Sequence, residues 1–211
     1  MTVREPIPVP QPQHLVLDGV AWDFYERVLD QIGSRPMRVT FLRGRMEIMS
    51  PLPEHEELKK AIARLIEAMV LQRGMAMRAF GSATFRREDK ESGLEPDECY
   101  YLRNELSVRG MKRFDPAVHP PPDLALEIDL TRPSIPREPV YAALGVPELW
   151  RYDGNHLSIL TLTSKGDYTA VQSSIAFPFL PIGEFEAFIH RMQSEEQTTL
   201  LREFQRWIAS L

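Results

Sequence analysis

Hydrophobic residues recur three or four positions apart in several segments, a spacing that predicts amphipathic helices. The clearest such segment is 54–71, which has acidic residues in its first turn and Gly74 just beyond its end. Gly33 and Gly145 end two other helices, and Ser194-Glu195-Glu196-Gln197 has the spacing of a capping box before the last one. The predicted helices are 20–32, 54–71, 137–144, 182–192 and a last helix carrying Leu200, Leu201, Phe204, Trp207 and Ile208.

Short runs of β-branched, aromatic and other apolar residues lie between these helices and predict strands. Turn residues separate the runs, such as Arg43-Gly44 at the tip of a predicted hairpin. We interpret the charged run 87–93 as a solvated turn, and the polar stretch 103–119 as an irregular excursion. The predicted strands are 37–42, 45–49, 75–80, 83–86, 95–102, 124–130, 148–152, 156–162 and 168–173.

This order of elements predicts an α/β or α+β protein in which a mixed β-sheet is flanked by helices. The chain has 211 residues and 43% hydrophobic content, which is enough for one sizeable core. We therefore expect a single domain over residues 15–211. Residues 1–14 contain alternate prolines and no periodicity, so they predict an extended N-terminal arm.

Composition narrows the classes of function. The net charge of −5 gives no overall basic surface, so any contact with nucleic acid needs a local patch. The single cysteine, Cys99, excludes a disulfide framework and a Cys-rich zinc site, and it fits a reducing compartment. The chain shows no signal-peptide pattern and no apolar run of membrane-spanning length. We expect a soluble cytoplasmic protein with no membrane partner.

Candidate chemistry begins on the strand that follows Pro120-Pro121-Pro122. Side chains alternate along a strand, so Asp123, Glu127 and Asp129 share one face, while leucines and an isoleucine occupy the other. Burial of an unpartnered carboxylate costs several kcal/mol, roughly, so these acids are solvated, ion-paired or bound to a metal ion. The pattern alone leaves all three readings open.

Asp97 stands at the head of another predicted strand. Two strand carboxylates brought close together repel each other unless a cation lies between them, and magnesium or manganese favours oxygen ligands of this kind. Asp97 and Glu127 are therefore candidate metal ligands, and the matching chemistry is phosphodiester hydrolysis. The bland alternative is that both are solvated at strand ends. His55, in the first turn of the 54–71 helix, is a further candidate catalytic residue, although a histidine at such a position is more often a capping or solvated side chain.

Three segments carry a family resemblance: Glu95-Pro96-Asp97, the strand 122–131, and 141–154, which reads YAALGVPELWRYDG. They resemble the Uma-type restriction-endonuclease-like family, a branch of the PD-(D/E)XK nuclease superfamily. The resemblance implies a restriction-endonuclease-like mixed sheet flanked by helices and a metal-dependent endonuclease acting on DNA. It also implies metal binding by Asp97 and Glu127, and the Glu54-His55 pair is similar to a family feature.

The chain departs from the superfamily pattern at the lysine. Asp129 stands where the superfamily has that residue, and many members of this branch carry it instead four residues before a tyrosine, where this chain has Arg137. Arginine stays protonated, so Arg137 can stabilise phosphate charge but cannot act as a base. Asp129 is then a third metal ligand or a partner of Arg137.

These features leave three readings of function. The first is a magnesium-dependent endonuclease, the second a catalytically degenerate nuclease fold that binds nucleic acid or a protein partner, and the third a globular interaction domain with surface acids. The last helix carries an apolar stripe of Leu200, Phe204, Trp207 and Ile208, which is either core packing or a dimer face. We expect a homodimer, because two active sites are the simplest way for a small domain to cut both strands of a duplex.

Overall fold

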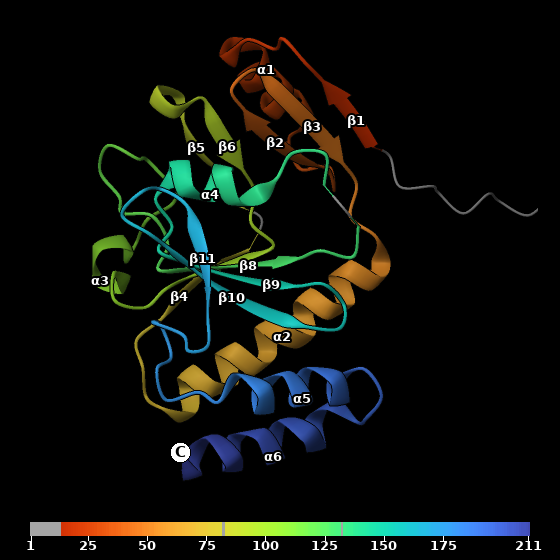
Figure 1. The fold of residues 1–211 in the computed structure, drawn as a ribbon, viewed down its shortest axis with the longest axis vertical. Helices are drawn as coiled ribbons and strands as arrows, with labels where there is room; N and C mark the ends of the chain where they lie inside the picture. The colour runs from red at the N-terminus through yellow and green to blue at the C-terminus, as the bar shows by residue number, and fades with distance from the viewer. Residues whose placement is uncertain (1–13, 82, 132) are drawn as a thin grey trace, which may run out of the picture.

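The chain folds into two β-sheets with helices packed on them, as Figure 1 shows for the computed structural model. The structure describes residues 14–81, 83–131 and 133–211. The predicted α+β class with a mixed sheet is confirmed. The predicted arm lies outside the described residues except for His14, which begins a strand instead.

The mixed sheet has six strands in the order β11-β10-β9-β8-β7-β4. Only β8 and β9 pair in parallel, and the helix between them supplies the crossover that parallel neighbours require. Every other pair in this sheet is antiparallel. The strands are β4 (Arg78–Gly81), β7 (Glu98–Tyr101), β8 (Leu124–Ile128), β9 (Glu148–Tyr152), β10 (Leu157–Leu162) and β11 (Tyr168–Val171).

The second sheet is antiparallel and has five strands in the order β1-β3-β2-β6-β5. The sequence did not predict a second sheet, because hairpins look alike whichever sheet they join. Its strands are β1 (His14–Leu17), β2 (Arg38–Leu42), β3 (Arg45–Met49), β5 (Phe85–Arg87) and β6 (Ser92–Leu94).

Helices cover the sheets in three groups. On one face of the mixed sheet lie α2, α5 and α6, whose apolar side chains pack on Leu124, Leu126 and Ile128 of β8. On the other face, α4 packs on Ala125, and α1 covers the antiparallel sheet through Tyr25 and Phe41. The helices are α1 (Trp22–Ile32), α2 (Pro53–Gln72), α3 (Glu105–Val108), α4 (Arg137–Leu144), α5 (Ile182–Met192) and α6 (Gln197–Ser210), with a 3-10 turn η1 (Glu88–Lys90).

The charged run 87–93 is not wholly a solvated turn, because its last two residues form part of β6. Gly93 lies in β6 because the strand packs closely against Tyr25 there. A Cβ at this position would lie 3.0 Å from Cζ of Tyr25. Because Gly93 has no side chain, the ring of Tyr25 on α1 packs directly on β6. The charged run predicts a turn at Gly93, but in the structure this glycine allows α1 to pack closely on β6.

The last helix also differs from its prediction in two ways. Glu196, not Ser194, caps α6, because its carboxylate accepts hydrogen bonds from the N–H groups of Thr198 and Thr199 at 2.8 and 2.7 Å. The apolar stripe is not a dimer face, since Leu200, Phe204 and Ile208 are buried against α2 and α5. The expected homodimer stays a prediction, but the apolar stripe of α6 does not supply its interface. Among the described residues, no helix is both long and apolar enough to span a membrane.

Candidate active site

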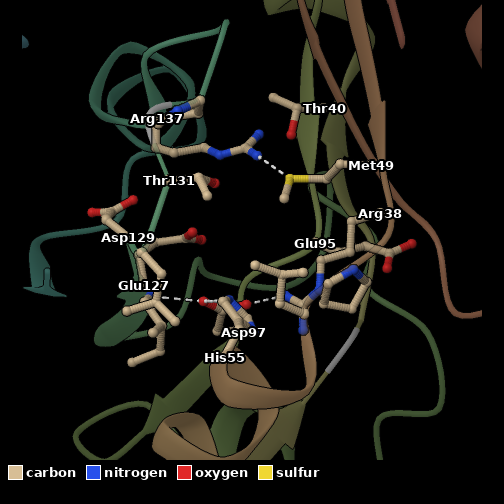
Figure 2. Close-up of a pocket in the computed structure, with 15 residues that line it drawn as sticks. Arg38, Thr40, Met49, His55, Glu95, Asp97, Glu127, Asp129, Thr131 and Arg137 are labelled. Carbon is tan, nitrogen blue, oxygen red and sulfur yellow. Dashed lines mark hydrogen bonds and ion pairs between the residues drawn. The ribbon is translucent and has the colours of Figure 1, made fainter. Parts of the chain in front are cut away.

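Asp97 and Glu127 come together on the face of the mixed sheet that α4 covers. Strands β7 and β8 pair antiparallel with Glu98 opposite Leu126, so one further step of the register places Asp97 opposite Glu127. Both side chains line one small cavity of about 40 Å³ between the two sheets (Figure 2). The convergence that the sequence predicted is present, and the roles of the residues remain predictions.

The carboxylate of Asp97 is almost fully enclosed and accepts three hydrogen bonds. Arg38 of β2 donates to Oδ1, and Nε2 of His55 donates to Oδ2 at 2.9 Å. The main-chain N–H of Ile128 donates to Oδ2 as well, at 2.7 Å. Burial alone would raise the pKa of Asp97, but the hydrogen bond from His55 and the charge of Arg38 outweigh burial and hold the pKa below its usual value. Asp97 is therefore ionised in the folded protein.

The pKa of Glu127 is shifted in the opposite direction from that of Asp97. Burial, with a further contribution from the negative charge of Asp97, raises the pKa of Glu127 to about 8. The hydroxyl of Tyr141 donates to Oε1 of Glu127, and the charge of Arg137 also opposes the rise. These two contacts offset burial only in part. Glu127 is thus a buried carboxyl group that lacks enough positive charge around it.

Arg137 is the first residue of α4 and points into the space between the sheets (Figure 2). Its Nη2 lies 3.0 Å from Oε2 of Glu47 and 3.4 Å from Sδ of Met49, both on β3. Glu47 is buried and also accepts hydrogen bonds from Nε2 of His14 at 2.8 Å and from the N–H of Ser134 at 2.7 Å. Glu47 therefore holds the guanidinium of Arg137 at the wall of the cavity.

Asp129 does not pair with Arg137, which corrects one of the two predicted alternatives. Its Oδ2 accepts a hydrogen bond from Nε of Arg151 at 2.6 Å. Arg151 lies on β9 beside Glu127 in the parallel register, and it also pairs with Glu138. Burial raises the pKa of Asp129, and the pairing with Arg151 opposes that rise. Asp129 still lines the same cavity, but the described residues include no group of three side chains placed to hold a metal ion, so its predicted role as a third metal ligand stays a prediction without structural support.

His55 is brought into the site, where the sequence had favoured a capping or solvated side chain. It lies in the first turn of α2 with its ring buried. Because Nε2 binds Asp97, the ring orients that carboxylate and favours its ionised form. The predicted catalytic role of His55 stays a prediction.

Sequence reasoning missed Arg38, Tyr141 and Glu47 as parts of the site. Arg38 alternates with Val39 and Phe41 on β2, and a charged residue in the first position of a buried strand was the available signal. Tyr141 was used only to locate Arg137, four residues before it. The sequence pattern places Glu47 in a strand and indicates no function for it. Each of these side chains contacts a partner outside its own helix or strand, which the pattern of one element does not identify.

The donor set fits a hard divalent cation with two protein ligands. An ionised carboxylate offers about four acceptor positions, and Asp97 uses three of them. Among the described residues, no side chain or N–H donates to Oε2 of Glu127. No group of three or more His, Cys, Asp or Glu residues in the described ranges is close enough to form a metal cluster. Magnesium is commonly held by one or two carboxylates together with water and substrate phosphate, which matches this pair.

Comparisons with known proteins found a matching family and a similar solved structure. Residues 22–183 match the model of the Uma2 family, described as "Putative restriction endonuclease". A crystal structure of a "putative nuclease belonging to DUF820" from Anabaena variabilis is similar to the chain, with a TM-score of 0.47 at 12% identity. The similarity covers 85% of this chain and 97% of that chain. No curated protein sequence matches the chain.

Proposed function

Because the chain belongs to the Uma2 family, described as "Putative restriction endonuclease", we propose that it is an endonuclease that uses magnesium or manganese to hydrolyse phosphodiester bonds in DNA. One observation carries the metal dependence: Asp97 and Glu127 share a buried cavity in which the pKa of Glu127 is raised to about 8. Two carboxylates in this position repel each other, and a divalent cation between them removes the repulsion.

Asp97 and Glu127 hold the cation in this proposal. When bound, the ion supplies charge that neutralises the phosphate and acidifies water to provide hydroxide near neutral pH. His55 keeps Asp97 ionised and oriented through its hydrogen bond at 2.9 Å. Tyr141 orients Glu127 and offsets part of the rise in its pKa, because its hydroxyl favours the ionised carboxylate.

Arg137 supplies a fixed positive charge at the cavity wall. Glu47 restrains its guanidinium at 3.0 Å, so little reorganisation is needed when a phosphate approaches. Arginine binds phosphate through several N–H donors, and it remains protonated throughout the reaction. Arg137 therefore stabilises charge that develops on the phosphate and transfers no proton.

A second candidate function rests on Asp97. Arg38 already neutralises this carboxylate, and Asp129 stands at the lysine position of the superfamily pattern. An arginine that competes with a metal ion for Asp97 favours a catalytically degenerate protein that binds nucleic acid or a protein partner. The two functions differ in whether DNA is cut when metal is present.

The test is nicking of supercoiled DNA in magnesium, in manganese and in a chelator. Wild type should nick DNA only with metal, and Glu127→Ala and Asp97→Ala should both be inactive. Glu184→Ala is the matched control, because it removes an exposed carboxylate at the start of α5, away from the cavity. Calorimetric titration with magnesium should show binding to wild type and to the control alone.

Each result separates the candidates. Metal-dependent nicking by Glu127→Ala at the wild-type rate would assign the activity to a contaminant or to another site. Wild-type protein that binds DNA without cutting it in either metal would establish the degenerate binder.

A further inference from the structure

A groove lined by basic and aromatic side chains lies beside β5, away from the candidate active site. Its volume is about 300 Å³, and its walls include Arg86, Lys112, Arg113, Phe80 and Phe114. The whole chain carries a net charge of −5, so a cluster of three cations is a local departure from the overall charge. Such a patch is the electrostatic footprint that nucleic-acid binding requires.

The cations of this groove are available to a ligand. Lys112 and Arg113 are exposed, and no carboxylate among the described residues forms an ion pair with either one. Arg86 has one acidic partner, Glu26, at 3.7 Å, near the outer limit for an ion pair. A phosphate backbone that enters the groove would therefore not have to displace strong internal pairs.

The aromatic rings of the groove are held in place and only partly covered. Phe114 packs on Phe85 with ring centroids 4.7 Å apart. Phe80 contacts the ring of Tyr101, and the guanidinium of Arg78 already lies over one face of its ring, 5.1 Å from the centroid, so Phe114 is the better stacking ring. Fixed rings at a surface beside cations form a stacking platform for nucleic-acid bases.

The groove neighbours a second cavity that borders the candidate active site. Thr84 lines both the groove and a second cavity of about 630 Å³, and its hydroxyl donates to Glu95 at 3.0 Å. The second cavity in turn shares Arg38, Pro51 and Glu95 with the cavity of Asp97 and Glu127. The three hollows therefore lie next to one another and share wall residues, and together they are called the track here.

Basic side chains outnumber acidic ones along the two outer hollows. The acidic ones are Asp30, Glu56 and Glu95, and Glu56 is already paired with Lys59 at 2.5 Å. The basic ones are Arg35, Arg38, Lys59, Arg86, Lys112 and Arg113.

We propose that this track binds a single-stranded segment of nucleic acid, with a base stacked on Phe114 and phosphates paired with Arg86, Lys112 and Arg113. Single strands fit because the faces of paired bases in a duplex are covered by their neighbours and cannot stack on protein rings. The cavity at the end of the track has room for only a few water molecules, so a strand must present its phosphate singly at the mouth. The delivery of that phosphate to Asp97 and Glu127 rests on the proposed nuclease function, whereas binding in the groove does not.

The experiment measures fluorescence anisotropy of a labelled DNA oligonucleotide, as a single strand and as the matching duplex, in a chelator that prevents cleavage. The test variant is Lys112→Glu/Arg113→Glu. The control is Arg202→Glu/Arg206→Glu, which makes the same charge change on exposed residues of α6. We expect wild type to prefer the single strand and the test variant to bind it about tenfold more weakly, with the control within about twofold of wild type.

Two further readouts make the result specific. Loss of two phosphate contacts should make the dependence of log K on log salt shallower by about 1.4, at roughly 0.7 per contact for single strands. Phe114→Leu keeps an apolar contact with Phe85 but removes the stacking face, and it should weaken binding with little change in the salt dependence.

Tighter binding of duplex than of single strand would overturn the proposal, as would equal losses in the test and control variants. Groove-dependent binding without any metal-dependent nicking would support the groove and reject the nuclease. Nicking by wild type, together with unchanged binding by Lys112→Glu/Arg113→Glu, would retain the nuclease and reject the groove.

Discussion

The main-chain N–H of Ile128 donates a hydrogen bond of 2.7 Å to Oδ2 of Asp97, which ties the start of β7 to the strand that carries Glu127. This contact fixes the two acidic residues side by side, since it adds to the register in which Glu98 faces Leu126. The pair is therefore built into the sheet and does not depend on a mobile loop. This placement disfavours the ionised form of Glu127 more than that of Asp97, because Asp97 accepts more hydrogen bonds and contacts a cation directly.

We predict that Glu127→Gln stabilises the protein at pH 8. The folded-state pKa of Glu127 is raised to about 8 from its ordinary value of 4.5, so between these values the folded state holds a proton that the unfolded state has released. Wild-type stability should therefore fall as the pH rises from about 5 to 8, and the glutamine variant should lack this decline. The gain at pH 8 should be about 1–3 kcal/mol, measured by urea unfolding at pH 5 and pH 8.

Glu148→Gln is the matched control for a buried glutamate. Its carboxylate accepts hydrogen bonds from Trp150 and Ser174 on Oε1, and from the N–H groups of Ile175 and Ala176 on Oε2. An amide nitrogen cannot accept from these donors, so this substitution should destabilise the protein by about 1–3 kcal/mol. Equal effects of the two substitutions would show that Glu127 is not under electrostatic strain.

We predict that Tyr141→Phe moves the acid limb of the cleavage profile to higher pH. The Tyr141 hydroxyl lowers the pKa of Glu127 through its hydrogen bond, so its removal should raise that pKa further. If ionised Glu127 holds the metal ion, activity should then appear at a pH about half a unit to one unit higher. Nicking rates across pH 5 to 9 provide the measurement.

Tyr168→Phe provides the comparison for that experiment. Its hydroxyl donates to the carbonyl oxygen of Val146 at 2.5 Å, outside the cavity. The profile of this variant should coincide with that of wild type. A shift of equal size in both variants would mean that the change reflects general loss of stability.

The sequence predicted the elements well where the signal was local. Helix α4 spans Arg137–Leu144 as expected, because Gly145 ends it in the left-handed conformation with φ of 82°. Glu127 of β8 and Asp129 just after it line the same cavity, as alternation along a strand predicts. The two metal-ligand candidates followed from this alternation and from the family motif.

The partners of the acids could not be predicted in the same way. Arg38 pairs with Asp97 and Arg151 with Asp129 through contacts between strands distant in the sequence. Strand pairing decides these contacts, and the pattern of one strand does not state which other strand lies beside it. For the same reason, the sequence does not predict the division into two sheets. Strands β4 and β5 follow each other closely in the chain, yet they join different sheets.

We predict that Arg38→Met destabilises the folded protein by about 3–5 kcal/mol at pH 7, because it leaves the buried Asp97 carboxylate without its cation. The pKa of Asp97 is lowered in the folded state, so this contribution is present above the unfolded value and is lost as the pH falls through the folded one. The deficit should therefore shrink in acid. Arg38→Met/Asp97→Asn should recover part of the loss, because it removes the buried charge as well.

Thermal or urea unfolding of the four proteins in this cycle tests the coupling. Arg27→Met is the control, since its ion pair with Asp23 is exposed and should contribute little. Additive effects of Arg38→Met and Asp97→Asn would show that the two side chains do not stabilise each other.

The last prediction separates a nuclease from a degenerate binder through Arg137. If its charge stabilises the phosphate, Arg137→Lys should keep most of the nicking activity, because no proton has to leave the side chain. Arg137→Ala should slow nicking about a hundredfold or more, the effect typical of the loss of one preorganised donor. Because Arg137→Ala also leaves Glu47 without its cation, unfolding must be measured on the same preparations, and Glu47→Gln/Arg137→Ala separates the two effects. A double variant that regains stability but stays slow would establish the catalytic charge. Wild-type rates in Arg137→Ala, with Glu127→Ala inactive, would instead show that Arg137 serves only to pair with Glu47.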